Sequence, residues 1–172
     1  ISLGLSWNRL YKGFGEGLAS GLGIEGGLYA PLRFNLYLGD HKIHMSPKGE
    51  VSFVFASGEE KDREYTVFGF RGSGDVEFSY RYSPNLDLLA LGGVNGYFWH
   101  IKEKRLDESK TYTRSHVILP GFKIAGGFSY PLLEGRRPKI MFSAHIPNVV
   151  MLNKSNQTQV HSYYTLGIYF DF

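Results

Sequence analysis

The chain has 172 residues, a formal net charge of +3 and no cysteine. This composition excludes disulfide bridges and thiolate metal sites, and no stretch is basic enough to form a nucleic-acid-binding arm. The 22 glycines, 13 phenylalanines and 12 tyrosines are typical of a β-rich protein, because aromatic side chains favour pleated, half-buried surfaces. We expect one domain covering residues 1–172, with no linker that divides it.

No apolar run approaches the ~20 consecutive residues that a membrane-spanning helix needs. The sequence begins at Ile1 instead of a methionine, and its first residues show no signal-peptide pattern. We therefore expect a mature or trimmed product whose export signal is not shown. The slightly negative mean hydropathy is compatible with a membrane barrel, since the polar register of each strand dilutes the apolar one.

Alternation of apolar and polar residues divides the chain into eight expected strands. Turns at Pro31, Pro84 and Pro131 interrupt the alternation, and proline cannot donate a hydrogen bond to a strand ladder. Longer polar connections are expected at 12–16, 47–64, 102–114 and 153–159. The strands are expected at 1–11, 17–29, 33–45, 64–82, 86–101, 115–130, 138–149 and 160–172, with both termini on the short-turn side.

The segment from Glu50 to Ser57 suits a loop badly, because its apolar residues alternate. It predicts a hairpin that extends the third strand and protrudes beyond the barrel. The alternative is an additional strand pair inside the sheet, which would raise the strand count to ten.

The final strand shows the alternation most clearly. One register holds Val160, Ser162, Tyr164, Leu166, Ile168, Phe170 and Phe172, and the other holds His161, Tyr163, Thr165, Gly167, Tyr169 and Asp171. A period of two over this length indicates one apolar face and one polar face. In a soluble barrel the apolar face points inward, whereas in a membrane barrel it faces lipid.

The polar registers of several strands combine glycines with a few charges of opposite sign. The charged residues that we expect to line the interior are Glu25, Arg33, Arg71, Asp75, Glu77, Arg81, Lys123, Lys139 and Asp171. Small residues and paired ions suit a narrow lumen that side chains must fill. We therefore favour a closed membrane barrel over a soluble lipocalin-like binding barrel, and we expect no diffusion pore.

This architecture resembles the small eight-stranded outer-membrane barrels, a group that includes OmpA, OmpX and the lipid A-modifying enzymes. The terminal Phe172, with Tyr169 and Phe170 before it, resembles the carboxy-terminal signal that the barrel-insertion machinery reads. The resemblance implies an all-β, antiparallel, up-and-down transmembrane barrel in the outer membrane of a Gram-negative-type bacterium. It implies contact with lipid and lipopolysaccharide, and with the insertion machinery during assembly. The sequence identifies no further protein partner.

Residues 144–148, Ala-His-Ile-Pro-Asn, are similar to a segment of PagL, a lipid A deacylase. In that family a histidine activates a serine and a glutamate orients the histidine. His145 matches the base, but Pro147 stands at the nucleophile position and the glutamate position falls near His161. Ser143 is a substitute nucleophile at best. We expect these three candidates, His145, Ser143 and His161, to be polar lumen residues, and a PagL-like deacylase is the alternative function.

The third connection is basic on balance. Its cations, which could pair with lipopolysaccharide phosphates, are Lys102, Lys104, Arg105, Lys110 and Arg114. A charged loop kept for solubility would have the same composition, so both interpretations stay open. We expect no cofactor and no metal site, since His41 and His44 would lie on opposite faces of a strand. The expected function is a structural, adhesive or complex-forming barrel that acts through extracellular loops.

Overall fold

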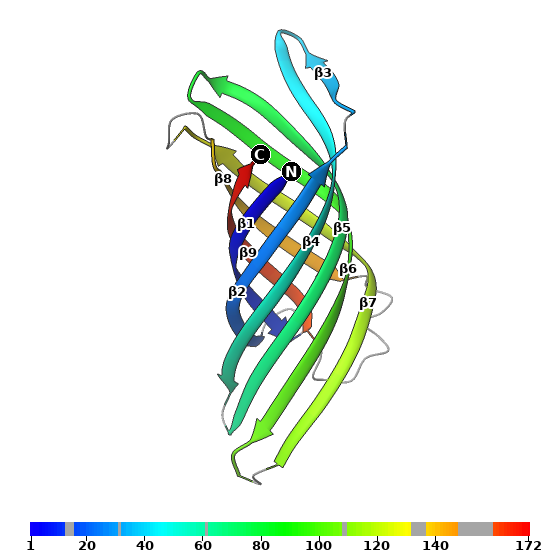
Figure 1. Cartoon of the computed structure of the whole chain (residues 1–172), viewed down its shortest axis with the longest axis vertical. Helices are drawn as coiled ribbons and strands as arrows, with labels where there is room; N and C mark the ends of the chain where they lie inside the picture. Colours follow the sequence, from blue (N-terminus) through cyan, green and yellow to red (C-terminus); the bar gives the residue numbers. More distant parts are fainter. Residues whose placement is uncertain (13–15, 31, 61, 108–109, 132–136, 148–159) are drawn as a thin grey trace.

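The computed structural model shows a closed barrel of tilted antiparallel strands (Figure 1). It describes residues 1–12, 16–30, 32–60, 62–107, 110–131, 137–147 and 160–172. The strands are β1 (Ser2–Lys12), β2 (Glu16–Tyr29), β3 (Phe34–Leu38), β4 (His41–Glu60), β5 (Arg63–Ser83), β6 (Leu86–Arg105), β7 (Lys110–Ser129), β8 (Lys139–Pro147) and β9 (Val160–Asp171). All except β3 form the ring, in the order β1, β2, β4, β5, β6, β7, β8 and β9. The expected fold class and the count of eight wall strands are confirmed.

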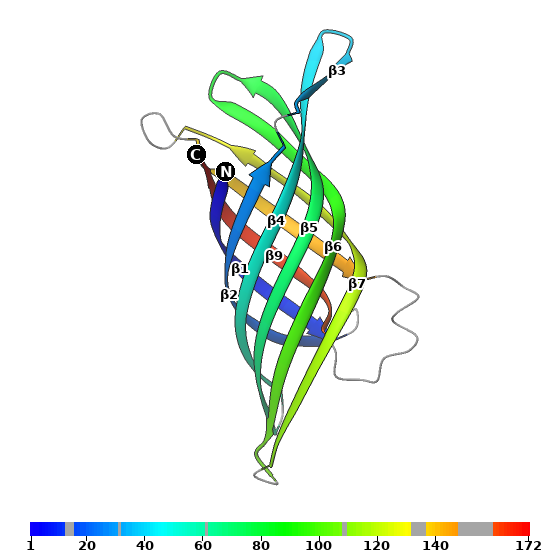
Figure 2. The same ribbon diagram turned by 45° about the vertical axis from the view of Figure 1, so that its right-hand side comes forward.

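β3 lies outside the ring and pairs with β4. The two strands form a hairpin in which Phe34 stands opposite Met45 and Leu38 opposite His41. It projects beyond the barrel at the end where the chain termini lie (Figures 1 and 2). Its turn contains Gly39, whose φ of 60° lies in the left-handed region that favours glycine. In the part of the chain that the structure describes, no helix has the length and apolarity needed to cross a membrane.

The expected third strand and the connection after it are wrong. β4 continues through residues 47–60 as a full wall strand, so Glu50 pairs with Gly27 of β2 and with Ser73 of β5. The segment from Glu50 to Ser57 is therefore neither a protruding hairpin nor an added strand pair. Pro47 is tolerated because it lies where β2 has ended. Its carbonyl accepts a hydrogen bond from the Ala30 amide at 2.9 Å, and no ladder bond needs the missing N–H.

The expected connection at 102–114 is also shorter than predicted. β6 runs to Arg105 and β7 begins at Lys110, with Lys102 paired to Thr113. In β7, residues 119 and 120 stand opposite a single residue of β6, because Asn95 pairs with Gly121 and Tyr97 with Ile118. Pro120 therefore occupies a β-bulge, where proline removes no ladder bond. The expected connection at 153–159 lies outside the described residues.

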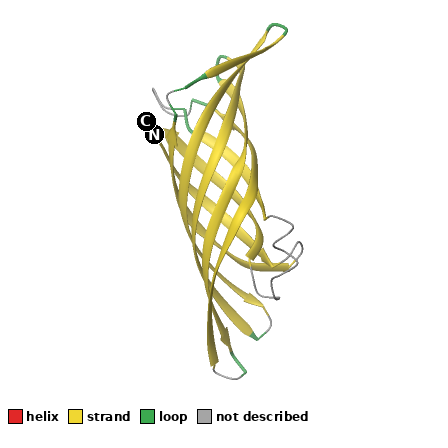
Figure 3. Cartoon of the chain, turned by 90° about the vertical axis from the view of Figure 1, so that its right-hand side faces the viewer, coloured by secondary structure: helices red, strands yellow, loops and turns green. Residues whose placement is uncertain are grey.

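Strand length divides the barrel into two walls. The long wall comprises β4 to β7, with 20 or 21 residues per strand. The short wall comprises β1, β2, β8 and β9, with 9 to 14 residues per strand. The long wall extends past the short wall at both ends of the molecule (Figures 1 and 3). We call the end that carries residues 1 and 172 the termini end, and the opposite end the far end.

Side chains alternate between the outer and inner faces of the wall. Along β1, Leu3, Leu5 and Trp7 are 51–66% exposed, whereas Ser6 and Asn8 are at most 3% exposed. The final strand shows the same alternation, with its even residues outward and its odd residues inward from Tyr163 to Tyr169. An apolar outer face and a polar inner face are the inverse of a water-soluble barrel.

Candidate functional site

The barrel interior contains two layers of different chemistry. The first, which we call the ion network, lies toward the termini end and consists of Glu25, Lys48, Glu50, Arg71, Asp75 and Lys123. The second, which we call the aromatic plug, lies toward the far end. It consists of Leu10, Leu18, Ala19, Val54, Ala56, Tyr65, Val67, Tyr97, Trp99, Ile101 and Tyr163. Both layers are buried, so side chains occupy the lumen from one layer to the next.

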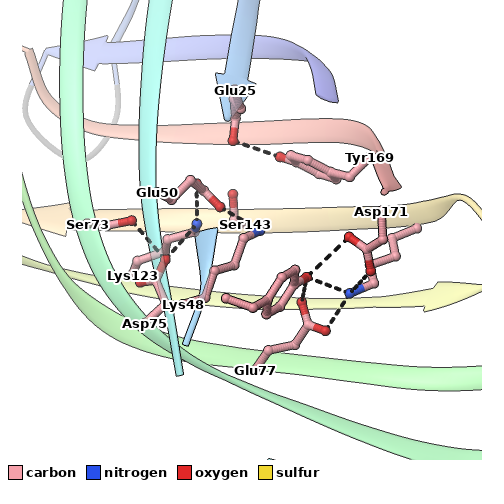
Figure 4. Close-up of polar contacts among 12 residues, drawn as sticks. Glu25, Lys48, Glu50, Ser73, Asp75, Glu77, Lys123, Ser143, Tyr169 and Asp171 are labelled. Atoms are coloured by element: carbon pink, nitrogen blue, oxygen red, sulfur yellow. Dashed lines mark hydrogen bonds and ion pairs between the residues drawn. The ribbon is translucent and has the colours of Figure 1, made fainter. Parts of the chain in front are cut away.

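Glu50 is the central carboxylate of the ion network. It pairs with Lys48 at 3.0 Å, with Lys123 at 2.6 Å and with Arg71. Lys123 also reaches Asp75 at 3.2 Å, as Figure 4 shows. The network holds three carboxylates and three cations, all at most 5% exposed. Such a group is stable only with its charges balanced, because an unpaired ion in this interior would carry the full cost of desolvation.

Arg71 connects the ion network to the aromatic plug. Its Nη2 donates to Glu25 at 2.9 Å, and its Nη1 donates to the Tyr163 hydroxyl at 3.0 Å. Glu25 in turn accepts a hydrogen bond from the Tyr169 hydroxyl at 2.9 Å. Tyr163 belongs to the plug, where its ring meets Trp99 edge-on at 5.5 Å between centroids. One guanidinium therefore fixes the relative position of the two layers.

His145 and Ser143, the catalytic candidates, lie inside the barrel. The His145 ring stacks on Tyr163 at 4.0 Å, and its Nε2 lies 2.8 Å from Arg71 Nη1 and 3.1 Å from Ser143 Oγ. Its Nδ1 lies 3.0 Å from the Asn95 carboxamide nitrogen. Serine and histidine are thus in hydrogen-bonding contact, but they are only 4% and 1% exposed. His161 belongs to β9, and its side chain lies outside the described residues.

A second ionic cluster lies at the mouth of the barrel, at the termini end. Lys139 pairs with Glu77 at 2.5 Å and with Asp171 at 2.9 Å, and it donates to the Tyr29 hydroxyl at 2.6 Å. These contacts are also drawn in Figure 4. A cavity of about 430 Å³ opens beside them. It is lined by Ile1, Tyr29, Arg33, His44, Ser46, Glu77, Ser79, Arg81, Lys139, Asp171 and Phe172.

The nine charged residues expected in the lumen divide into three groups. The first group is buried in the interior and contains Glu25, Arg71, Asp75, Glu77, Lys123 and Lys139. Asp171 lies at the mouth, where its carboxylate is partly exposed. Arg33 and Arg81 are exposed at the rim of the mouth cavity, and Arg81 pairs with Asp87.

Lys48 and Glu50 belong to the ion network but are missing from the expected set. The sequence prediction places Lys48 in the polar connection at 47–64 and Glu50 at the start of the segment expected to form a protruding hairpin. The available signal was the alternation of Val51, Phe53 and Phe55 with Ser52 and Val54. That pattern, extended backwards by two steps, places residues 48 and 50 on the inner face.

The cations of the third connection lie on strands at the far end of the long wall. Lys102, Lys104 and Lys110 are exposed, and Lys104 pairs with Glu64 at 3.2 Å. Arg105 lies 3.5 Å from the buried carboxylate of Glu103. The side chain of Arg114 lies outside the described residues. The structure thus brings these residues to one end of one wall.

The proposed insertion signal at the carboxy terminus has residues on both faces of β9. Phe172 is 67% exposed, and Phe170 points outward and is partly exposed. Tyr169 points inward to Glu25. Among the described residues, no group of three or more His, Cys, Asp or Glu is placed to hold a metal ion.

These features define the class of the molecule as a small antiparallel barrel with an apolar outer wall and a filled interior. Neither a protein-family model nor a curated protein matches the sequence. Solved structures match the fold. The attachment invasion locus protein Ail of Yersinia pestis is 11% identical over 99% of this chain and 95% of its own, with a TM-score of 0.50. Neisserial surface protein A is 9% identical with the same coverage and TM-score. The outer-membrane enzyme PagL is 6% identical over 97% of each chain, with a TM-score of 0.46. The likeness to Ail and to Neisserial surface protein A, together with the ring of eight antiparallel strands, shows the fold of the small eight-stranded outer-membrane barrels.

Proposed function

We propose that this chain is an integral outer-membrane protein with a closed barrel, which anchors charged hairpins at the cell surface. Its role is structural, adhesive or complex-forming. The observation that carries this proposal is the combination of a filled interior with a long wall that continues beyond the barrel. A barrel whose lumen is filled by side chains provides no channel, so we expect its function to lie on its surfaces. The apolar outer face and the fold shared with outer-membrane barrels support the location.

The orientation follows from the turns. Outer-membrane barrels have short periplasmic turns and longer extracellular loops. The longest connection, twelve residues between Pro147 of β8 and Val160 of β9, joins strand ends at the far end, whereas two residues join β5 to β6 at the termini end. We therefore place the termini end in the periplasm and the far end outside. The hairpin of β3 and β4 is then periplasmic. It is a different segment from the hairpin expected at Glu50 to Ser57, which belongs to the wall strand β4.

The extracellular surface is formed by the far-end hairpins of the long wall. The outer face of β6 presents Lys102 and Lys104 there, and β7 begins with the exposed Lys110. Ammonium groups at the membrane boundary pair with phosphates or with acidic groups of a partner. We therefore propose lipopolysaccharide phosphates as the first ligands of this surface. A pull-down from native membranes would identify a protein partner.

Cysteine labelling tests the orientation, because the chain has no cysteine of its own. Lys104→Cys places a thiol at the far end, and Asp40→Cys places one in the turn of the β3–β4 hairpin. A membrane-impermeant maleimide should label the first variant in intact cells and the second only after the outer membrane is permeabilised. The reverse pattern would contradict the orientation. Full solubility of the protein without detergent would contradict the membrane location itself.

The alternative function is a PagL-like lipid A deacylase. The enclosure of His145 and Ser143 argues against it, since an ester of a membrane lipid must reach both side chains. Mass spectrometry of lipid A from cells with and without the protein tests this alternative. A loss of an acyl chain that His145→Ala abolishes would replace our proposal with the enzymatic one.

We also propose that the insertion machinery recognises Phe172 during assembly. The side chain is outward-facing and 67% exposed at the termini end, where a binding partner can reach it. Deletion of Phe172 should lower the fraction of folded barrel in cells while leaving refolding from urea into detergent unchanged. An equal loss in both measurements would assign Phe172 a purely structural role.

A further inference from the structure

The outer face of the short wall carries one charge among the side chains that the structure describes. Arg9 points outward from β1, because its neighbours Asn8 and Leu10 are both 0% exposed and fill the interior. Among the described side chains of β1, β2, β8 and β9, Arg9 is the charged residue on the outer face. A cation on the lipid side of a barrel costs about 2–4 kcal/mol at the membrane midplane and close to nothing at the interface. The position of Arg9 along the strand therefore matters.

Arg9 lies near the far edge of the apolar belt. It stands seven residues along β1 from Ser2, which corresponds to roughly 18 Å along the barrel axis at ~3.3 Å per residue and a tilt of about 40°. The apolar band of such barrels is about 25 Å tall. In the proposed orientation, Arg9 therefore lies roughly 7 Å inside the outer edge of a band that starts at Ser2, and its long side chain can extend toward the headgroup region of the outer leaflet. Tyrosines at the same level fit this boundary, since Tyr11 and Tyr164 flank Arg9 on the outer face.

Arg9 is part of a hollow in the outer wall. The hollow has a volume of about 290 Å³ and is lined by Trp7, Arg9, Tyr11, Phe142, Tyr164, Thr165 and Leu166. Its aromatic side is ordered, because Tyr11 meets Tyr164 edge-on at 5.3 Å and Phe142 stacks on Tyr164 at 5.8 Å. On the belt side it presents Trp7, Phe142 and Leu166, each more than half exposed. The hollow thus joins a cationic end to an apolar surface.

The guanidinium of Arg9 has open hydrogen-bonding capacity. Its recorded contact is the ring of Tyr11, 5.7 Å from the guanidinium carbon, and it forms no ion pair with the residues that the structure describes. The guanidinium lies beside Gly17 of β2, where an added Cβ would be in van der Waals contact with Arg9 Nη2 at 3.6 Å. An arginine in this state presents a planar donor pair that matches the oxygens of a phosphate.

We propose that this hollow binds the phosphate-bearing headgroup of an outer-leaflet lipid. The Arg9 guanidinium holds the phosphate, and the first acyl segment lies on Trp7, Phe142 and Leu166. Charge complementarity and the joined cationic and apolar surfaces select this class of ligand. The inference rests on the proposed membrane location. The site is separate from the basic hairpin of β6 and β7, because Lys102 pairs with Thr113 of β7, eight residues beyond Gly121, where the pairing of β7 with β8 ends.

Lipid binding to the purified barrel in a neutral maltoside detergent tests this site. The probes are bisphosphorylated lipid A, its dephosphorylated form and phosphatidylglycerol, and native mass spectrometry measures lipid retention. Arg9→Gln should weaken binding of the phosphorylated lipids about 10-fold or more, the effect of losing a charge-assisted bidentate contact. Arg9→Lys keeps the charge and should show an intermediate loss. Lys42→Gln is the matched control, because Lys42 is an exposed cation on the β3–β4 hairpin at the termini end, and it should leave this binding unchanged.

Trp7 supplies a second measurement in the same hollow. It is 51% exposed on the outer face, whereas Trp99, the other tryptophan, is 1% exposed in the interior. Phosphorylated lipids with brominated acyl chains should therefore quench Trp7, and Arg9→Gln should remove the preferential part of that quenching. A stronger response to lipid A or to phosphatidylglycerol identifies the source of the phosphate, and either supports the site.

Several outcomes would overturn the proposal. They are equal binding of dephosphorylated and phosphorylated lipid A, unchanged binding by Arg9→Gln, and a loss of binding in Lys42→Gln as large as in Arg9→Gln. A heat-modifiable gel shift first establishes that each variant is folded, and Arg9→Lys carries the test if Arg9→Gln does not fold. If the wild-type protein shows no heat-modifiable barrel and needs no detergent, the proposed membrane function fails instead, independently of lipid retention.

Discussion

The ion network and the aromatic plug fill the same lumen by different means. In the ion network each buried charge is compensated by its neighbours, so removal of one member leaves the others unpaired. In the plug, packing provides the stability, and each change has a local cost. The comparison shows that the lumen of a narrow barrel can be closed either by buried charges that balance one another or by closely packed apolar side chains. The ion network is therefore sensitive to the loss of a single charge, and the aromatic plug is sensitive to a change in side-chain volume.

Loss of the central carboxylate should have the largest effect. Glu50→Gln leaves Lys48, Arg71 and Lys123 with one carboxylate fewer, and should lower the free energy of unfolding by about 3–5 kcal/mol, the cost of breaking a buried ion pair from one side. Urea titration in lipid vesicles, followed by the gel shift of the folded barrel, measures this loss. Glu64→Gln removes an exposed carboxylate that pairs with Lys104, and should cost less than about 1 kcal/mol.

The double variant Glu50→Gln with Lys123→Met sharpens the same comparison. If compensation holds the network together, the double variant should be less destabilised than the sum of the single variants, with an interaction energy of about 0.5–3 kcal/mol. Strict additivity of the two changes would show that the network is not a unit.

The plug should respond most strongly to added volume at Gly69. The Trp99 ring lies directly over Gly69, where it occupies the place that a Cβ would take. Gly69→Ala must displace the ring and should cost about 3 kcal/mol, at the upper end of the range for overpacking. Gly92→Ala is the control, because a Cβ there meets nothing within 4 Å. The same urea titration applies, and equal stabilities of the two variants would contradict the packing account.

Two tyrosines at the border of the layers give the smallest effect. Tyr163→Phe removes the hydroxyl that accepts from Arg71, and should cost about 1.5 kcal/mol, as expected for a hydrogen bond to a charged group. Among the residues that the structure describes, the buried Tyr97 hydroxyl has no hydrogen-bond partner, so Tyr97→Phe should be neutral or slightly stabilising. Thermal midpoints in one detergent are sufficient to compare them. A larger drop in thermal midpoint for Tyr97→Phe than for Tyr163→Phe would contradict the distinction between the two layers at this border.

Much of the fold was predictable because membrane barrels impose a strict period of two. The final strand shows this, since the apolar residues Leu166, Ile168 and Phe172 point outward and Tyr163 and Thr165 point inward, as their alternation predicts. The same reasoning places Glu25, Arg71 and Lys123 in the interior. Periodicity therefore identifies the face of a residue wherever the strand itself is recognised.

Strand ends and side-chain partners were harder to predict. Pro47 indicates the end of a strand. A proline loses no ladder hydrogen bond, however, where the neighbouring strand has already ended. Only the structure shows that β2 ends at Tyr29. The sequence therefore did not predict that Glu50 is the central carboxylate of the ion network. The sequence also provides no reason to single out Arg9. One arginine in an alternating strand looks like any polar position until its neighbours in β8 and β9 are known.

The seam between β1 and β9 has a consequence for folding kinetics. The Ile1 ammonium and the Phe172 carbonyl meet at 3.3 Å across 171 positions of sequence, and the two strands pair along almost their whole length. Contacts of such high sequence separation form slowly, because the entropy of loop closure opposes them until many bonds form together. Before this step the sheet has two unpaired edges, each able to pair with another chain. We therefore expect seam closure to limit the folding rate, and the assembling chain to be most prone to aggregation just before it.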